Sequence, residues 1–107
     1  MAMIASLSAL AEPNRLAIVE LLRDHGPHSV GEIAGTLDLR QPLVSKHLRV
    51  LSDAGMVAAR IDAQRRIYDL QEAPFREIDG WLDSFAAVWA GRLDRLDAHL
   101  RRSEDPS

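Results

Sequence analysis

The sequence predicts a small, mainly α-helical domain that carries one β-hairpin. Three observations support this fold class. Apolar residues recur at helical spacing over most of the 107 residues, which indicates amphipathic helices. Proline, glycine and capping residues divide this pattern into short helices. Residues 56–70 instead carry β-branched and aromatic residues that partly alternate with polar ones, as strands do.

Proline residues set the limits of the first two expected helices. The first helix covers about residues 3–10 and ends near Glu12, because the residue before a proline is disfavoured in the α region. Pro13 then suits the first turn of the second helix, which ends at residues 25–27. The apolar face of this second helix is expected to comprise Leu16, Ile18 or Val19, and Leu22.

Two further helices follow, separated by a tight turn at Asp38-Leu39. Ser29 and Glu32 have the form of a capping box, which predicts the start of the third helix. The fourth helix opens with Gln41-Pro42, and Gly55 lies where the end of a helix favours a left-handed residue. The expected core positions are Val30, Ile33, Ala34 and Leu37, and then Leu43 or Val44, Leu48 and Leu51.

The remaining elements are a β-hairpin and one long helix. Residues 56–61 and 66–70 are expected to form the strands, with a polar tip at 62–65. The last helix is expected over about residues 73–101, where apolar residues repeat every three or four positions, close to a heptad seam. We expect residues 1–102 to form a single domain and residues 103–107 to form a disordered tail.

The length of the last helix favours a homodimer. At about 42 Å it is longer than a domain of this size is wide, so part of its apolar face lacks an intramolecular partner. The alternative is that this helix packs wholly on its own domain. Dimerisation is expected through the first and last helices. The expected interface residues are Leu7, Leu10, Ile78, Trp81, Leu82, Phe85, Val88, Trp89, Leu93 and Leu96.

Composition excludes several function classes. The chain has no cysteine, which excludes disulfides, thiolate zinc sites and thiol nucleophiles. It has no apolar run long enough to span a bilayer and no cationic signal-peptide start, so we expect a cytoplasmic protein without a membrane partner. No glycine-rich phosphate loop or Ser, His and carboxylate arrangement points to an enzyme, and no cofactor is expected.

The net charge of −3 is unevenly distributed along the chain. Between Arg40 and Arg66 there are six basic residues against only Asp53 and Asp62, a local balance of +4, so the rest of the chain sums to −7. Two helices joined by a tight turn and followed by a hairpin form a winged helix-turn-helix arrangement. Because its second helix and hairpin carry the positive segment, the expected partner is double-stranded DNA.

The candidates for DNA contact lie on the fourth helix and at the hairpin tip. On the helix, a glutamine or serine can bond base edges, whereas basic side chains suit phosphates. For His47 two interpretations stay open, a DNA contact or a residue that orients the helix. The arginines at the hairpin tip suit phosphate or minor-groove contacts. The expected DNA-binding residues are Gln41, Ser45, Lys46, His47, Arg49, Arg65 and Arg66.

Several motifs, in order, resemble those of the arsenic-repressor (ArsR) family of regulators. They are Ala-Leu-Ala-Glu-Pro-Asn-Arg with the residues that follow it to position 22, the capping segment 29–34, the segments 41–51 and 54–57, and residues 65–70. The resemblance covers about residues 7–70 in detail. It implies a dimeric winged-helix repressor whose recognition-helix positions include Gln41, Ser45, Lys46 and His47.

The departures from the family pattern concern metal binding. Family metal sensors often carry Cys-x-Cys in the third helix, where this chain has Ser29-Val30-Gly31. Asp97-Ala98-His99 matches half of a second family metal site, and nothing after it supplies the other half. Residues 88–100 resemble a subgroup that does not sense metals, so no metal site is expected and no inducer can be named.

The expected function is sequence-specific repression of transcription by a homodimer on a palindromic operator. Two alternatives stay open. One is a repressor of the same fold that responds to a metal held by Asp97 and His99 across the dimer, or to a small molecule near Trp81, Phe85 and Trp89. The other is a winged-helix module that binds an acidic protein partner.

Overall fold

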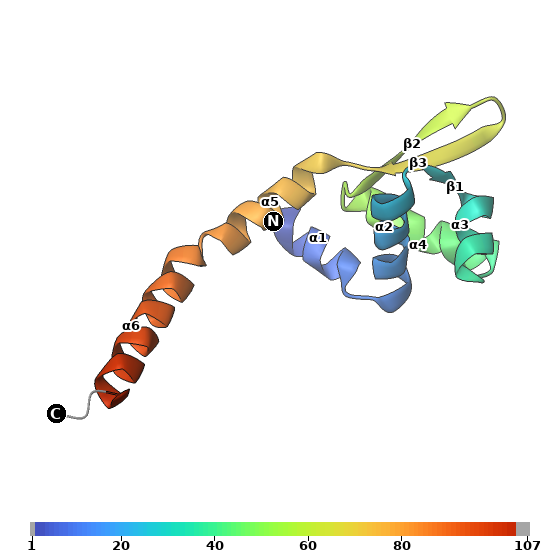
Figure 1. Cartoon of the computed structure of the whole chain (residues 1–107). Helices are drawn as coiled ribbons and strands as arrows, with labels where there is room; N and C mark the ends of the chain where they lie inside the picture. Colours follow the sequence, from blue (N-terminus) through green and yellow to red (C-terminus); the bar gives the residue numbers. More distant parts are fainter. Residues whose placement is uncertain (1, 105–107) are drawn as a thin grey trace. The chain divides into compact units, whose positions relative to one another are not determined.

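The computed structural model describes the backbone of residues 2–104 and the side chains of residues 3–102. The chain forms two compact units, residues 1–76 and 77–107, and each is described by itself. No helix in the described part of the chain is long and apolar enough to cross a membrane. The elements, in chain order (Figure 1), are α1 (Ala2–Leu10), α2 (Pro13–His25), β1 (His28–Ser29), α3 (Val30–Leu37), α4 (Gln41–Asp53), β2 (Val57–Asp62), β3 (Arg65–Leu70), α5 (Glu72–Asp83) and α6 (Ala86–Glu104).

The corner between α1 and α2 is fixed by a carboxylate and an arginine. Glu12 is the N-cap of α2, and its Oε2 accepts the backbone N–H of Arg15 at 2.8 Å. The Arg15 side chain donates from Nε to the carbonyl oxygen of Ala9, in α1, at 2.7 Å. Pro13 stands in the first turn of α2, where its missing N–H costs no helical hydrogen bond. The expected boundary between the first two helices is confirmed.

The turn between α3 and α4 forms as the sequence predicts. The Ser29 hydroxyl accepts the N–H of Glu32 at 3.2 Å, and Glu32 Oε1 accepts the N–H of Ser29 at 2.8 Å, which completes the capping box. Asp38 ends α3 in the left-handed conformation, with φ 54°. The N-cap of α4 is Arg40, which makes no side-chain capping bond. Gly55, just after α4, has φ 75°, as expected.

The sheet has three antiparallel strands in the order β1-β3-β2. The expected hairpin is confirmed, but its strands reach Asp62 and Arg65, so the turn is only Ala63-Gln64. The sequence did not predict β1, which has two residues and is too short to show alternation. It pairs His28 with Tyr68 and Ser29 with Ile67.

The core of the first unit lies among α2, α3, α4 and the base of the sheet (Figure 1). One expected core position is wrong, because Leu16 is 43% exposed. Of the alternatives Leu43 and Val44, Val44 is the buried one. Leu16 instead borders an open apolar hollow of about 560 Å³ beside Leu10 and Phe75. Its side of α2 therefore faces away from the core. The largest fully buried apolar residues are Ile18, Ile33, Val44, Leu48, Leu51 and Met56.

The single long helix expected over residues 73–101 is wrong, because α5 and α6 are separated at Ser84 and Phe85. The Ser84 hydroxyl donates to the carbonyl oxygen of Trp81 at 2.6 Å. The Phe85 N–H donates to Leu82, three residues back, at 3.1 Å, which tightens the last turn. The α6 helix includes residues 103 and 104, where the tail was expected to begin; the rest of that expected tail, 105–107, lies outside the described residues.

Candidate nucleic-acid interface

Helix α4 presents one buried and one exposed face. The buried residues Val44, His47, Leu48 and Leu51 follow the i, i+3, i+4, i+7 spacing of a core-facing stripe. The polar candidates for DNA contact all lie on the exposed side of the helix. They are Gln41, Ser45, Lys46 and Arg49.

His47 does not share the exposed environment of the other candidates on α4. It is 8% exposed, and its Nδ1 lies 3.7 Å from Oε2 of Glu12, the N-cap of α2. Its Nε2 is buried and has no hydrogen-bond partner among the described residues. The geometry favours the second interpretation, a residue that orients α4. The spacing of His47 from Val44 and Leu51 could have revealed this.

A groove of about 420 Å³ separates α4 from the wing, the β2–β3 hairpin. Ser45 and Arg49 line it from the helix, and Arg66 lines it from β3, so three of the expected contacts face one hollow. Ser52 and Tyr68 also line this groove and were not predicted. Ser52 lies one helical turn after Leu48 and Arg49. Helical spacing alone could not show that it lines the groove, because other exposed residues of α4 have similar spacing.

The other two helix candidates lie beside different neighbours. Lys46 borders a shallow hollow of about 240 Å³ with Arg40, Pro42 and Leu43. The Nε2 atom of Gln41 lies 3.3 Å from the point where a Cβ would stand on Gly31 of α3. A glycine at position 31 therefore leaves room for the Gln41 side chain at the start of α4.

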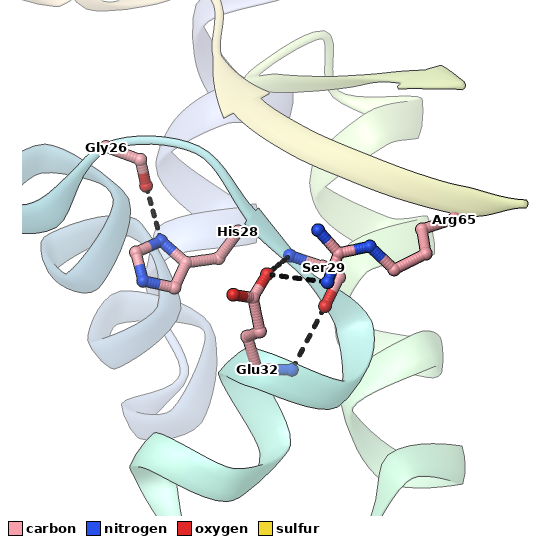
Figure 2. A network of polar contacts seen from close by, with 5 residues as sticks. All are labelled: Gly26, His28, Ser29, Glu32 and Arg65. Atoms are coloured by element: carbon pink, nitrogen blue, oxygen red, sulfur yellow. Dashed lines mark hydrogen bonds and ion pairs between the residues drawn. The ribbon is translucent and has the colours of Figure 1, made fainter. Parts of the chain in front are cut away.

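The wing is tied to the start of α3 through the capping box (Figure 2). Arg65, the first residue of β3, places Nη1 3.8 Å from Oε1 of Glu32. The same oxygen accepts the backbone N–H of Ser29. Beside this cluster, the His28 ring donates from Nδ1 to the carbonyl oxygen of Gly26 at 2.7 Å. His28 thus stiffens the turn that leads into β1.

The Glu32 carboxylate is ionised well into the acid range. The backbone N–H of Ser29 lowers the pKa of Glu32 first, followed by the Ser29 hydroxyl, against a smaller opposing effect of burial; the positive charge of Arg65 lowers it further. Glu32 is therefore a permanent negative charge beside the wing at neutral pH.

Positive charge gathers on the exposed surface of α4 and the wing. All six basic residues between positions 40 and 66 are exposed. Within the described residues, Arg65 is the one of these six that forms an ion pair. The other five are available to the phosphates of a nucleic acid. They are Arg40, Lys46, Arg49, Arg60 and Arg66.

The second unit carries an exposed apolar face rather than a polar site. Trp81 and Phe85 meet edge to face with ring centroids 5.2 Å apart, and the Arg92 guanidinium lies 5.0 Å from the Trp89 ring centre. Except for Ile78, which is half-buried, the interface residues expected on this unit are all exposed. Leu7 and Leu10, expected on the first helix, are half-buried.

The possible metal ligands Asp97 and His99 lie on α6. The described residues contain no group of three or more His, Cys, Asp or Glu side chains that could hold a metal ion. The Asp97 carboxylate is engaged by Arg101, one helical turn on, with Nη2 2.9 Å from Oδ2. A metal at Asp97 would have to displace this arginine.

The fold and the exposed basic face together define the class of winged helix-turn-helix DNA-binding proteins. A sequence model of the bacterial regulatory proteins of the arsR family matches residues 12–59. HTH-type transcriptional regulator Rv2034 of Mycobacterium tuberculosis is 44% identical over 77 residues, which are 72% of this chain and 71% of that protein. The chain belongs to the ArsR family of transcriptional regulators, as the motifs indicated.

Two further comparisons extend this result. The biofilm growth-associated repressor of Agrobacterium fabrum is 44% identical over 66 residues, which are 62% of this chain and 56% of that protein. The solution structure of the homodimeric winged helix-turn-helix DNA-binding domain of Mb0332 from Mycobacterium bovis, a possible ArsR-family regulator, matches with a TM-score of 0.65 and 28% identity. That match covers 92% of this chain and 84% of the other.

Proposed function

We propose that this regulator is a repressor that binds a palindromic operator as a homodimer. The observation that carries the proposal is the groove between α4 and the wing, where Ser45 and Arg49 face Arg66 within one compact unit. A recognition helix in the major groove would bring these side chains to bases and phosphates together.

The residues of α4 have different roles in this proposal. Gln41, at the first turn, reads a base edge, because an amide can bond adenine through both of its polar atoms. Ser45 contacts a base edge or a phosphate. Lys46 and Arg49 contact phosphates, which fixes the position of the helix without reading the sequence. Arg65 and Arg66, in the wing, contact the DNA backbone beside the groove that α4 enters.

The dimer would use the apolar faces of the helices outside the recognition region. Trp89, Leu93 and Leu96 of α6 are each more than half exposed, and exposed apolar patches commonly mark protein interfaces. The Mb0332 domain is homodimeric, and the Agrobacterium relative is named a repressor. A two-fold dimer requires half-sites whose centres are about 10 bp, or a multiple of that, apart.

The direct test is DNA binding to the region upstream of the protein's own gene. A duplex of that region should bind more tightly than a scrambled duplex of equal length, and protection from cleavage should show two symmetric half-sites. A duplex cut down to one half-site should bind much more weakly. Equal binding to the upstream and scrambled duplexes at every salt concentration would overturn the proposal.

A second candidate, a repressor released by a small molecule, is favoured by one observation. Trp81, Leu82, Phe85 and Trp89 line a hollow of about 280 Å³ on the second unit. An aromatic compound bound there would change the tryptophan fluorescence and weaken operator binding over the same concentration range. Titration with zinc or nickel checks the metal alternative at Asp97 and His99 in the same assay.

A further inference from the structure

We infer that Glu32 restrains the wing arginine Arg65 and so limits the affinity of this regulator for DNA of any sequence. Glu32 is a positioning residue in this inference, since it acts on DNA through Arg65. The inference rests on the proposed DNA-binding role of the wing. The inference concerns phosphate contacts, which add affinity for every DNA sequence and do not read the bases.

The sheet register, rather than side-chain flexibility, brings the two residues together. Ser29 pairs with Ile67 across β1 and β3, and the two strands run antiparallel. Residues that follow Ser29 therefore lie opposite residues that precede Ile67. A hollow of about 260 Å³ between them is lined by Ser29, Gly31, Arg65 and neighbouring residues. The first turn of α3 is thus held beneath the start of the wing strand (Figure 2).

One carboxylate oxygen serves two partners. Oε1 of Glu32 accepts the Ser29 N–H at 2.8 Å and lies 3.8 Å from Nη1 of Arg65. The capping box fixes the carboxylate, so its charge cannot move away when the arginine turns toward DNA. Arg66, the next residue, has no ion pair among the described residues. The chain therefore carries a restrained and an unrestrained arginine side by side.

A phosphate that binds Arg65 must compete with this fixed negative charge. Phosphate contacts add affinity for every sequence, while base-edge contacts from α4 discriminate between sequences. Weakening one phosphate contact lowers non-specific and specific binding together. It leaves the ratio of operator affinity to non-specific affinity unchanged, so the restraint sets how tightly the regulator binds DNA and not which sequence it prefers.

The experiment compares the full-length protein with Glu32→Gln by fluorescence anisotropy on a non-specific duplex and on the upstream duplex, over a salt series. Glutamine also occupies this position in capping boxes, so its amide oxygen keeps the Ser29 bond while the charge is lost. The expected result is about two- to fivefold tighter binding to both duplexes, the range of an exposed ion pair. The salt slope should steepen by up to about 0.9, one released counterion.

Three matched variants separate this effect from others. Ser29→Ala removes the hydroxyl half of the capping box but keeps the carboxylate, so it should lower thermal stability without tightening DNA binding. Arg65→Ala in the Glu32→Gln background should remove the gain in affinity. Arg66→Ala in the same background should weaken binding but leave the gain from Glu32→Gln intact.

Each outcome has a defined meaning. Weaker or unchanged binding by Glu32→Gln, with wild-type binding present, overturns the inference and leaves the proposed function standing. A gain that persists in the Glu32→Gln, Arg65→Ala double variant also overturns it, because the charge would then act without Arg65. A wild-type protein that binds neither duplex overturns the proposed function and this inference with it.

Discussion

Neighbouring residues on α4 have opposite environments, and this separates recognition from stability. Lys46 is exposed beside Arg40, whereas His47 is buried against Glu12. Lys46→Ala should weaken binding to all DNA sequences by a similar factor and reduce the magnitude of the salt slope by about 1. Thermal denaturation should change little, because the side chain is solvated. Anisotropy on two unrelated duplexes checks this, and a loss confined to one sequence would contradict the phosphate assignment.

His47→Ala should instead lower the stability of the fold and leave the salt dependence of DNA binding unchanged. Removal of a buried ring leaves a cavity and deprives Glu12 of its neighbour, so the free energy of unfolding should fall by about 1–3 kcal/mol. Urea denaturation measures this change. The salt slope of DNA binding by the folded fraction should stay as in the wild type. A stable variant with a smaller salt slope would mean that His47 contacts DNA after all.

The capping box also predicts a pH dependence of stability. Because the pKa of Glu32 is lowered in the folded state, its contribution to stability is fully present above its ordinary value of 4.5 and is lost as pH falls through the lowered folded value. Thermal melts of the wild type and Glu32→Gln should therefore differ at neutral pH and converge in acid. A constant difference between them at all pH values would contradict this account.

At the scale of elements, the two-residue wing turn holds Ala63 in a strained backbone conformation that a glycine would relieve. Ala63 has φ 57°, a conformation that costs a residue with a Cβ about 1–2 kcal/mol. Ala63→Gly should raise the free energy of unfolding by about 0.5 kcal/mol after the greater chain entropy of glycine is counted. Ala59→Gly, within β2, is the matched control and should lower it by about 0.5–1 kcal/mol. Thermal denaturation of both variants tests the pair, and equal destabilisation would contradict the strain.

The elements that the sequence could predict are those with local chemical signals. Pro13, the Ser29–Glu32 capping box and Gly55 mark boundaries through the conformations they favour, and each is found where expected. Strand β1 depends on pairing with a distant strand, and two residues cannot show that. At the break, the Ser84 hydroxyl bonds the carbonyl oxygen of Trp81. The apolar repeat continues across this point, so apolar spacing did not reveal a boundary there.

The candidate site was partly predictable for the same reason. Polar and basic side chains opposite an apolar stripe identify the exposed face of α4, so Ser45, Lys46 and Arg49 could be named from spacing alone. The sequence could not show that Tyr68 lines the same groove as α4, because this depends on how the wing lies against the helix in space. The pairing of Glu32 with Arg65 likewise follows from the sheet register and not from any local pattern.

At the scale of the whole molecule, there is a division between the unit that carries the positive segment and the unit that carries the exposed apolar face of α6. The segment from Arg40 to Arg66 carries +4 within an overall charge of −3, so the exposed surface of α4 and the wing is positive in an acidic protein. The exposed apolar side chains of α6 are on the unit that lacks this positive segment. A substitution in α6 therefore leaves the residues of this basic face unchanged.

This division predicts the effect of a charge placed in the apolar face of α6. Leu93 is 64% exposed, so Leu93→Asp should leave the fold of the first unit intact, and in a dimer it would bury an unpaired carboxylate. Sedimentation should show a monomer at concentrations where the wild type is a dimer. Operator affinity should fall by about 100-fold, because the second half-site no longer binds as part of one molecule.

The matched control for this variant is Ala98→Asp, an exposed position on the opposite face of α6. It adds the same charge to the same helix, so it measures the general electrostatic cost to DNA binding. It should stay dimeric and bind the operator almost as the wild type does. A Leu93→Asp protein that is still dimeric, or one whose loss of affinity equals that of Ala98→Asp, would mean that a different surface joins the two copies.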